Sequence, residues 1–182
     1  MAEKEPASAQ PLSAKTTTAM SWARARRRLA EADTYWLATV HPDGRPHVMP
    51  VLAVWLDGAV CFSTSESSRK GRNLACNSRC VLTVGSLRPP AVDLVVQGDA
   101  VKVTDEALLH RVADAYASKY GWRVTVRGGA FYGDGAPTAG PPPYAVFEVA
   151  PTLAFGFPGA IGPDDKRQGE EESFNPTRWR FS

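Results

Sequence analysis

Two Asp-Gly pairs lie close together in this chain, and each joins runs of residues that favour β-strands. The pairs are Asp43-Gly44 and Asp57-Gly58. Asp-Gly suits the tight turns of antiparallel hairpins, because glycine adopts positive φ without steric cost. The turns therefore predict a three-stranded antiparallel meander, whose strands are residues 34–40, 47–56 and 59–64.

The rest of the chain predicts more strands, with helices at the edges. Alternating apolar residues predict strands, whereas apolar residues three and four apart predict helices. No helix recurs between successive strands, which argues against a parallel βαβ sheet. We therefore expect a mainly β, α+β protein: a small antiparallel barrel with flanking helices, in which the longest strand bends across two parts of the barrel. The expected strands are 80–86, 92–104 and 144–155, and the expected helices are 21–32, 68–77 and 105–120.

Length and composition favour one domain. With 182 residues, 43% hydrophobic and 22% charged, the chain can bury a full core. Residues 1–17 have little apolar content and predict a disordered leader, followed by a single domain over 18–182. Within that domain, residues 123–142, which are rich in Gly and Pro, and residues 157–176 are expected to be mobile loops.

Charge and cysteine content argue against several classes of protein. The net charge of +2 gives no long-range positive field, so we expect a small-molecule partner rather than nucleic acid. The alternative is a nucleic-acid surface on the arginines of 24–28. No apolar stretch approaches the length of about 18 residues that a membrane span needs. The three cysteines have no zinc or redox spacing, so we expect no metal site, and free thiols in a reducing cytoplasm.

Hydroxyl and basic side chains gather where the third strand of the meander meets the helix predicted after it. A serine at 67 or 68 would cap this helix and leave its first backbone N–H groups free. Arg69, Lys70 and Arg72 then lie at the positive end of the helix dipole, where acidic residues would be more stable. A bound phosphate would reverse that preference. We call residues 62–74 the anion socket; the alternative is a solvated basic turn.

The strand predicted over 47–56 contains Pro50, which cannot donate to a sheet ladder. The strand must therefore have an edge, a gap or a bulge at this point. Such a feature would give a flat ring access to the main-chain groups of residues 48–51. The alternative is that Pro46 and Pro50 protect an edge from aggregation. A lone histidine such as His47 is more typical of a structural role than of catalysis.

Several short segments, from the first strand of the meander to the end of the chain, follow the pattern of a known family. They are Tyr35-Trp36-Leu37-Ala38-Thr39-Val40, Asp43-Gly44-Arg45-Pro46-His47-Val48-Met49-Pro50-Val51, Phe62-Ser63-Thr64, Ser68-Arg69-Lys70-Gly71-Arg72-Asn73-Leu74, Asp93–Gly98, Lys119–Trp122 and Thr177–Phe181. These segments resemble the pyridoxamine 5′-phosphate oxidase-like family, and most closely its actinobacterial flavin and deazaflavin oxidoreductases. The Ser-Arg-Lys segment of the anion socket is the most specific match.

The resemblance implies an antiparallel split β-barrel of the FMN-binding type that forms a homodimer, with two cofactor sites at the subunit interface. It implies that the anion socket grips the cofactor phosphate and that the strand after the first turn lines the ring. Asp93 would contact the ring or its ribityl chain. Trp179 and Arg180 would reach the site of the opposite subunit or, alternatively, form an ordinary docking strand. The implied phosphate residues are Ser63, Thr64, Ser68, Arg69 and Lys70, with Asn73 nearby, and the implied ring residues are His47, Val48, Met49, Pro50 and Val51.

The resemblance also implies an oxidoreductase that uses a phosphate-bearing flavin or deazaflavin, most simply by hydride transfer from reduced coenzyme F420 to a small organic acceptor. The segment His47-Val48-Met49-Pro50-Val51, together with Trp55 and the C-terminal Arg-Trp-Arg-Phe, resembles the branch of the family that favours F420. Pyridoxamine phosphate oxidases proper carry an Arg/Lys-rich strand and a C-terminal substrate motif that are absent here, so their own reaction is not expected. The alternatives are an FMN-dependent oxidoreductase, or a non-catalytic binder of flavin or of haem through His41, His47 or His110. No catalytic residue is assigned; His47 and Tyr132 are candidate proton donors.

Overall fold

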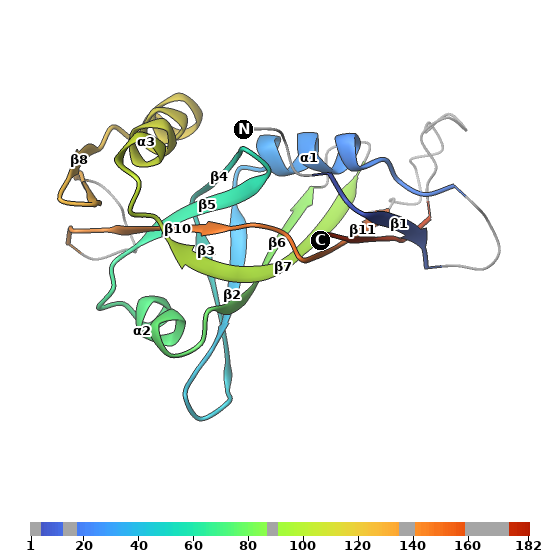
Figure 1. The fold of residues 1–182 in the computed structure, drawn as a ribbon, viewed down its shortest axis with the longest axis horizontal. Coiled ribbons are helices and arrows are strands. Elements are labelled where there is room, and N and C mark those ends of the chain that lie inside the picture. The colour runs from blue at the N-terminus through green and yellow to red at the C-terminus, as the bar shows by residue number, and fades with distance from the viewer. Residues whose placement is uncertain (1–4, 13–17, 87–90, 135–140, 159–174) are drawn as a thin grey trace.

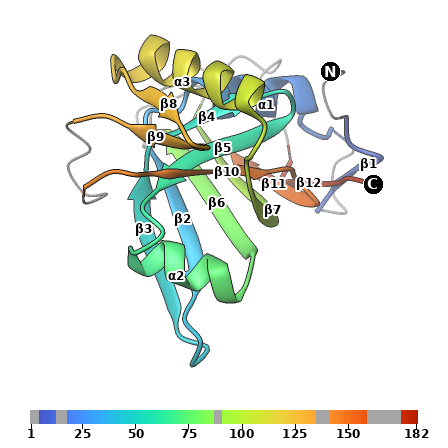
Figure 2. The same cartoon turned by 60° about the vertical axis from the view of Figure 1, so that its left-hand side comes forward.

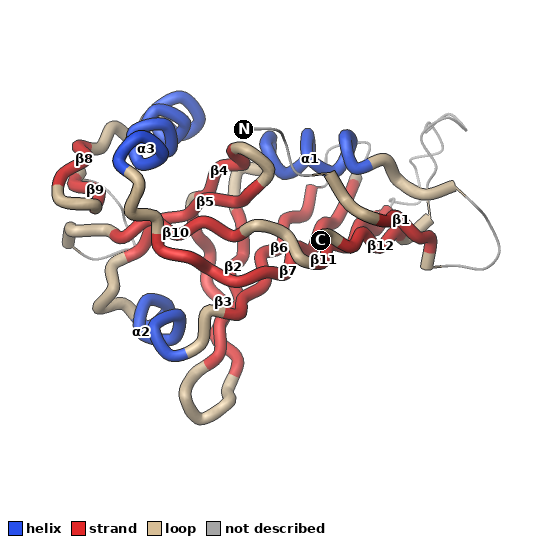
Figure 3. The backbone as a smooth tube through the Cα atoms, viewed as in Figure 1, coloured by secondary structure: helices blue, strands red, loops and turns tan. Residues whose placement is uncertain are grey.

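A ten-stranded antiparallel sheet forms the body of the protein, and three helices pack around it (Figure 1). The chain is seen in a computed structural model that describes residues 5–12, 18–86, 91–134, 141–158 and 175–182. Figure 3 separates helices, strands and loops by colour. The strands are β1 (Ser8–Pro11), β2 (Tyr35–Val40), β3 (Pro46–Val51), β4 (Ala53–Leu56), β5 (Ala59–Thr64), β6 (Arg79–Ser86), β7 (Val92–Lys102), β8 (Thr125–Arg127), β9 (Ala130–Tyr132), β10 (Ala145–Val149), β11 (Leu153–Pro158) and β12 (Thr177–Arg180), and the helices are α1 (Trp22–Glu31), α2 (Arg69–Cys76) and α3 (Glu106–Tyr120).

The long strand β7 joins the two halves of the sheet. It pairs with β6 over 92–99, with β11 over 92–97 and with β10 over 100–102. The sheet runs in the order β1-β12-β11-β7-β10-β5-β4, and from β7 it also continues through β6 and β2 to β3. The prediction that this strand spans two parts of a barrel is therefore confirmed, as is the mainly β class with flanking helices.

Each helix begins at a polar cap. Ser21, Ser68 and Asp105 accept hydrogen bonds from backbone N–H groups in the first turns of α1, α2 and α3. Helix α3 ends at Gly121, whose φ of 67° is the left-handed conformation that favours glycine. The three predicted helices are thus confirmed with nearly the predicted ends. Among the described residues, no helix combines the length and the apolar character needed to cross a membrane.

Two hydrophobic clusters fill the interior. The larger lies under α1 and includes Tyr35, Phe62 and Trp179. The smaller packs α3 against β4, β5 and β10 and includes Tyr116 and Phe131. Figure 2 shows α1 and α3 on one side of the sheet and α2 on the other. Helix α2 therefore stands apart from the two helices that cover most of the core.

Two strands that the sequence predicts as continuous are broken in the structure. The strand predicted over 47–56 divides at Leu52 into β3 and β4, and the one over 144–155 divides into β10 and β11. Pro151, which has no N–H to donate, lies in the second break. At the first break, tyrosine hydroxyls from α3 bind the backbone carbonyls of Leu52 and Ala53. These tyrosines lie 64 and 67 positions away along the chain, so a local pattern could not predict the break.

Part of the expected leader is ordered. Ser8–Pro11 form β1, which pairs with β12 at the other end of the chain. The prediction of a disordered leader over 1–17 is wrong for these residues, because composition does not reveal a strand whose partner is so distant. Residues 1–4 and 13–17 lie outside the described residues.

The two expected mobile loops also contain strands. The hairpin of β8 and β9 lies inside the loop predicted over 123–142, and the last two residues of β11 lie inside the one predicted over 157–176. The loop prediction is wrong at these places, because short strands with Gly at their turn resemble loops in composition. Residues 135–140 and 159–174 lie outside the described residues.

Trp179 closes the larger cluster, and we expect its truncation to be costly. The side chain is fully buried, its ring lies 5.3 Å from that of Trp22, and a Cβ at Gly156 would lie 2.7 Å from Trp179 Cη2. Trp179→Ala should lower the free energy of unfolding by about 3–5 kcal/mol in urea titrations, because it leaves a cavity. Arg180→Ala removes an exposed side chain and should change it by less than about 0.5 kcal/mol. Equally small effects from both changes would contradict this assignment of the core.

Candidate functional site

The sheet opens between β3 and the end of β5. Strand β3 pairs with β2 along its whole length and with no other strand among the described residues. The β4–β5 ladder ends at Ala53 and Phe62, so Ser63 and Thr64 pair only with β10. We call this gap, between β3 and the last two residues of β5, the slot. Because β3 is an edge strand, its Pro50 leaves no ladder bond unmade on the open side, which confirms the edge that the proline predicts.

Helix α2 begins directly beyond the end of β5 and lies beside β2 and β3 (Figure 2). The cap is Ser68, whose Oγ accepts from the Gly71 N–H at 3.1 Å and lies 3.0 Å from Thr64 Oγ1. The backbone N–H groups of Arg69 and Lys70 have no acceptor among the described residues. These are the free donors that the sequence predicts for the anion socket, and they carry the positive end of the helix dipole.

Gly71 lets the hydroxyl-rich loop close over the first turn of α2. A Cβ at this position would lie 2.4 Å from the backbone oxygen of Ser65 and 2.8 Å from Glu66 Cα. Inside the loop, Ser65 Oγ and Ser67 Oγ lie 2.8 Å apart, and the Ser68 N–H donates to the Ser65 carbonyl at 3.0 Å. Any larger residue at position 71 would push this loop off the helix, so glycine keeps the anion socket compact.

Lys70 is a largely buried lysine whose ammonium has no partner among the described residues. The residue is only 7% exposed, and its ammonium has neither a hydrogen-bond acceptor nor an ion-pair partner among the described residues. Burial lowers the pKa of Lys70 below its usual value. Taking an ammonium out of water without an acceptor costs free energy. The exposed Arg69 beside it adds a second positive charge, so the arrangement suits an anion that supplies the missing acceptor.

A short polar chain links α2 to His47 on β3. Asn73 is fully buried, and its Nδ2 donates to Thr39 Oγ1 at 3.0 Å, while its Oδ1 has no partner among the described residues. Thr39 Oγ1 in turn lies 3.4 Å from His47 Nδ1. Partial burial lowers the pKa of His47, and the nearby positive charges of His41, Lys70 and Arg69 lower it further. His47 is therefore uncharged at neutral pH and lies within the electrostatic field of the anion socket.

The structure gathers most of the predicted site residues around the slot and the anion socket. Thr64 and Asn73 are fully buried, so neither side chain faces a ligand; they hold Ser68 and Thr39 in place instead. The gathered residues are His47, Val48, Met49, Pro50 and Val51 on β3, Ser63 and Thr64 at the end of β5, and Ser68, Arg69, Lys70 and Asn73 at the cap and along α2.

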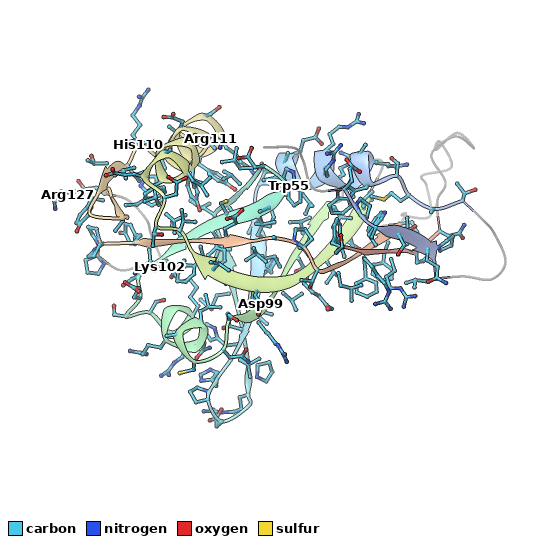
Figure 4. All side chains as sticks on the ribbon, viewed as in Figure 1. Trp55, Asp99, Lys102, His110, Arg111 and Arg127 are labelled. Atoms are coloured by element: carbon cyan, nitrogen blue, oxygen red, sulfur yellow. The ribbon has the colours of Figure 1, made fainter. Side chains whose placement is uncertain are left out.

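The structure does not bring Asp93 to this place within one chain. Lys102, at the other end of β7, reaches Glu66 beside the anion socket at 2.9 Å (Figure 4). Asp93 lies near the opposite end of β7, where the register Pro50–Trp36–Thr83–Val95 puts three strand spacings, about 14 Å, between β7 and β3. A contact from Asp93 to a ligand in the slot would therefore have to come from a second subunit.

Trp179, Arg180 and Trp55, which the resemblance links to the cofactor, also lie away from the slot. Trp179 is buried in the larger core cluster, so the prediction that it reaches a ligand is wrong, and the docking-strand alternative is confirmed for it. Arg180 is exposed on the same strand, which docks between β11 and β1. Trp55 packs edge-on against Trp22 under α1, far from α2 (Figure 4). Its apolar ring stabilises the core and does not line the slot.

Sequence reasoning missed two residues of the site. Thr39 joins Asn73 to His47, and Tyr116 of α3 binds the backbone at the end of the slot. Their partners lie 34 and 64 positions away along the chain. No spacing within a single element could have revealed either contact.

Two hollows lie elsewhere on the surface. One of about 500 Å³ is lined by residues of α1, β2, β6 and β7, including Trp36 and Gly85. Another of about 380 Å³ is lined by residues of β2, β6 and β7, including Thr39 and Asp99. Neither contains a basic residue of the anion socket. Because the slot is open to one side in a single chain, it is identified by its unpaired strand and buried cation rather than by enclosed volume.

A family model described as pyridoxamine 5′-phosphate oxidase matches residues 21–156, which is most of the chain. The chain belongs to the pyridoxamine 5′-phosphate oxidase family. The matched stretch runs from α1 to β11 and contains the slot and the anion socket. The resemblance that the motifs indicate is therefore confirmed, and with it the antiparallel split β-barrel with flanking helices.

Solved structures share the fold of this oxidase-family chain. An F420 reductase is 24% identical with a TM-score of 0.50, and the match covers 70% of this chain and 94% of that one. An FAD-binding protein from Mesorhizobium loti is 13% identical with a TM-score of 0.57, over 90% and 96% of the two chains. A haem-binding protein from Mycobacterium smegmatis is 18% identical with a TM-score of 0.60, over 79% and 56%. No curated protein matches the chain significantly.

We expect Lys70→Met to raise the pKa of His47. Removing the Lys70 charge removes one of the cations that disfavour the imidazolium, while methionine keeps the buried side chain apolar. The imidazole resonances in an NMR titration measure this pKa directly. Arg27→Met, which removes an exposed cation from α1, is the matched control and should leave the His47 titration unchanged. An identical titration in wild type and Lys70→Met would show that Lys70 does not act on His47.

Proposed function

We propose that this protein is an oxidoreductase that binds a phosphate-bearing flavin or deazaflavin, with the ring in the slot and the phosphate in the anion socket. The preferred cofactor is reduced coenzyme F420, and the reaction is hydride transfer to a small organic acceptor. Lys70 carries the proposal, because this lysine is 7% exposed and its ammonium has no acceptor among the described residues. A phosphate oxygen is a strong acceptor for such a group.

The residues of the anion socket fit a phosphate. The free N–H groups of Arg69 and Lys70 lie at a helix start, where backbone and dipole both favour an anion. The Ser67 hydroxyl and the Arg69 guanidinium are exposed beside them and can add donors. Glu66 is already paired with Lys102, which offsets the negative charge nearest to the anion socket.

The residues of the slot fit a flat ring with polar edges. Val48 and Met49 on β3 are exposed apolar side chains, which can cover the faces of such a ring. The open edge of β3 offers main-chain donors and acceptors to the polar atoms at the rim of the ring. Strand β3 carries no Arg or Lys, whereas the corresponding strand of the phosphate-oxidase branch is rich in both. The lack of cations favours an uncharged substrate beside the ring over one that carries a second phosphate.

The bound cofactor would supply the hydride chemistry, and the chain would supply binding, orientation and exclusion of water. Because the pKa of His47 is lowered, the imidazolium form that would act as an acid is disfavoured at neutral pH. Tyr132 lies on the β8–β9 hairpin beside Arg127, which sits at the outer side of α3 (Figure 4). Neither side chain therefore serves as the ready proton donor, which favours a proton from solvent.

The main alternative is an FMN-dependent oxidoreductase, since the same anion socket accepts either phosphate. The similar F420 reductase supports F420, and the similar FAD-binding protein supports a flavin. A non-catalytic binder is the further alternative, supported by the similar haem-binding protein. Titration with F420 and FMN side by side separates the F420-dependent enzyme from the FMN-dependent one. Haem binding through His41, His47 or His110 would instead give ligand-to-iron absorption bands, and these bands would vanish when the ligand histidine is replaced.

We expect Lys70→Ala to weaken binding of the preferred cofactor by about 1.5–3 kcal/mol, the range for a hydrogen bond to a charged group. Fluorescence titration of the purified chain with F420 and with FMN measures the change. Arg27→Ala removes an exposed cation from α1 and should leave the affinity within about twofold of wild type. If Lys70→Ala binds as tightly as wild type does, the phosphate role of Lys70 is refuted.

We further propose that two copies of the chain pair through the outer face of the sheet, so that each slot is completed by the partner subunit. Residues opposite each other on paired strands share a face. Trp36 and Val48 are 50% and 52% exposed on this face, and contiguous exposed apolar surface is unusual in a monomer. The outer-face residues, joined through the strand register, are Trp36, Val48, Pro50, Thr83, Val95 and Phe155.

Trp36→Glu should separate the two subunits. The change places a charge at the centre of the apolar face, where pairing would bury it without a partner. Sedimentation velocity should show a dimer for wild type and a monomer for the variant. Leu12→Glu, at an exposed leucine beside β1, is the control and should stay dimeric. A wild-type chain that sediments as a monomer would contradict the pairing.

A further inference from the structure

The ladder between β4 and β5 stops at a tyrosine hydroxyl. The register pairs Ala53 with Phe62, so the next pair in the ladder would be Leu52 with Ser63. Instead, the Tyr116 hydroxyl accepts from the Ser63 N–H at 3.1 Å and donates to the Leu52 carbonyl at 2.7 Å. The hydroxyl therefore occupies the place where a direct bond between the two strands would form, and the slot begins at this point.

The rest of α3 fixes this hydroxyl in position. Tyr116 is fully buried, and its ring contacts those of Trp122 and Phe131 at centroid distances of 5.6 and 6.1 Å. One turn further on, Tyr120 donates to the Ala53 carbonyl at 2.7 Å, and Lys119 donates to the same carbonyl at 3.0 Å. The three side chains share one helix face, because they lie three and four residues apart. Helix α3 thus holds the backbone of Leu52 and Ala53 by hydrogen bonds on the core side of the slot.

Chemistry favours a hydroxyl at this position. It must accept from one strand and donate to the other, and a tyrosine O–H does both while its ring fills the core. Burial raises the pKa of Tyr116, so the hydroxyl keeps its proton and both bonds persist across the physiological pH range. Phenylalanine has nearly the same shape but would leave Ser63 N–H and Leu52 C=O free to bond directly.

We propose that Tyr116 is a positioning residue whose hydroxyl holds Leu52, at the break between β3 and β4, apart from Ser63 of β5 and so keeps the slot open for the cofactor ring. The inference rests on the proposed function for its ligand, but the strand separation itself can be measured without a ligand. Tyr116 acts through Ser63, which is one member of the separated pair, and through Val51, which precedes the other member, Leu52; both border the slot. Its bond to the anion socket is to the backbone N–H of Ser63, at the opposite end of the socket from Lys70, so we expect its effect to fall on the ring rather than on the phosphate.

The test compares Tyr116→Phe with Tyr35→Phe in the full chain. Tyr35 is an equally buried tyrosine whose hydroxyl donates to the Leu29 carbonyl at the end of α1 and not to the Leu52 carbonyl. Both changes keep the ring and remove one hydroxyl, so similar losses of melting temperature are expected. F420, FMN and riboflavin, which has the FMN ring system without a phosphate, are titrated well below both melting temperatures.

We expect Tyr116→Phe to bind the preferred cofactor about tenfold more weakly, as for one lost buried hydrogen-bond network. If FMN is that cofactor, the loss for riboflavin should be the same factor, whereas Lys70→Ala should weaken FMN but not riboflavin. Tyr35→Phe should bind like wild type. A crystal structure of ligand-free Tyr116→Phe should show the Ser63 N–H bonded directly to the Leu52 carbonyl.

The outcomes separate the two proposals. A wild-type chain that binds neither F420 nor FMN overturns the proposed function. Tight binding by wild type and equally tight binding by Tyr116→Phe overturns the role of Tyr116 alone. Strands that stay apart at Leu52 and Ser63 in the ligand-free variant also overturn that role, because the hydroxyl would then not be what separates them.

Discussion

The positive charge of Lys70 has to be balanced by something that the described part of the chain does not contain. A lysine side chain that is 7% exposed and has no acceptor raises the free energy of the folded state. The Ser68 cap, the glycine at 71 and the closed hydroxyl loop hold the ammonium at the positive end of α2, where the penalty is greatest without an anion. The anion socket is therefore built against local stability, which is typical of a binding site.

The two hydrophobic clusters allow this arrangement. Helices α1 and α3 and the docking strand β12 complete the core on one side, and α2 lies on the other side, where Leu74 joins the larger cluster and the first turn holds the anion socket. The same division explains the slot. Strand β3 pairs with β2 on one side and remains an edge strand on the other. The start of β4 is held instead by hydrogen bonds from the tyrosines of α3. Stability and ligand access are supplied by different elements.

Much of the fold could be predicted from the sequence, because hairpin turns, strand alternation and helix caps are local signals. The meander, the long strand β7 and the three capped helices all follow from residues within one element, such as Gly44 and Ser68. The errors share one physical cause. β1, the break at Leu52 and the burial of Trp179 depend on partners from distant parts of the chain, which no window of sequence contains.

The candidate site divides in the same way. Lys70, Ser68 and the edge strand with Pro50 carry their own chemical signal and lie where the sequence indicates. Thr39 and Tyr116 carry none, because a threonine in a strand and a tyrosine at core spacing in a helix are ordinary. Only the fold shows that Thr39 links Asn73 to His47, and that the Tyr116 hydroxyl lies between Leu52 and Ser63. Asp93, a position that only the resemblance supplies, stays a prediction, because its contact with a ligand would come from a second subunit.

The most direct test of the account is a crystal structure of the chain with F420 or FMN bound. The account predicts a phosphate oxygen within hydrogen-bond distance of Lys70 Nζ and of the free N–H groups at the start of α2, with the ring against the open edge of β3. A cofactor whose phosphate lies elsewhere, for example in the hollow beside Trp36, with the Lys70 ammonium still unpaired, would contradict it.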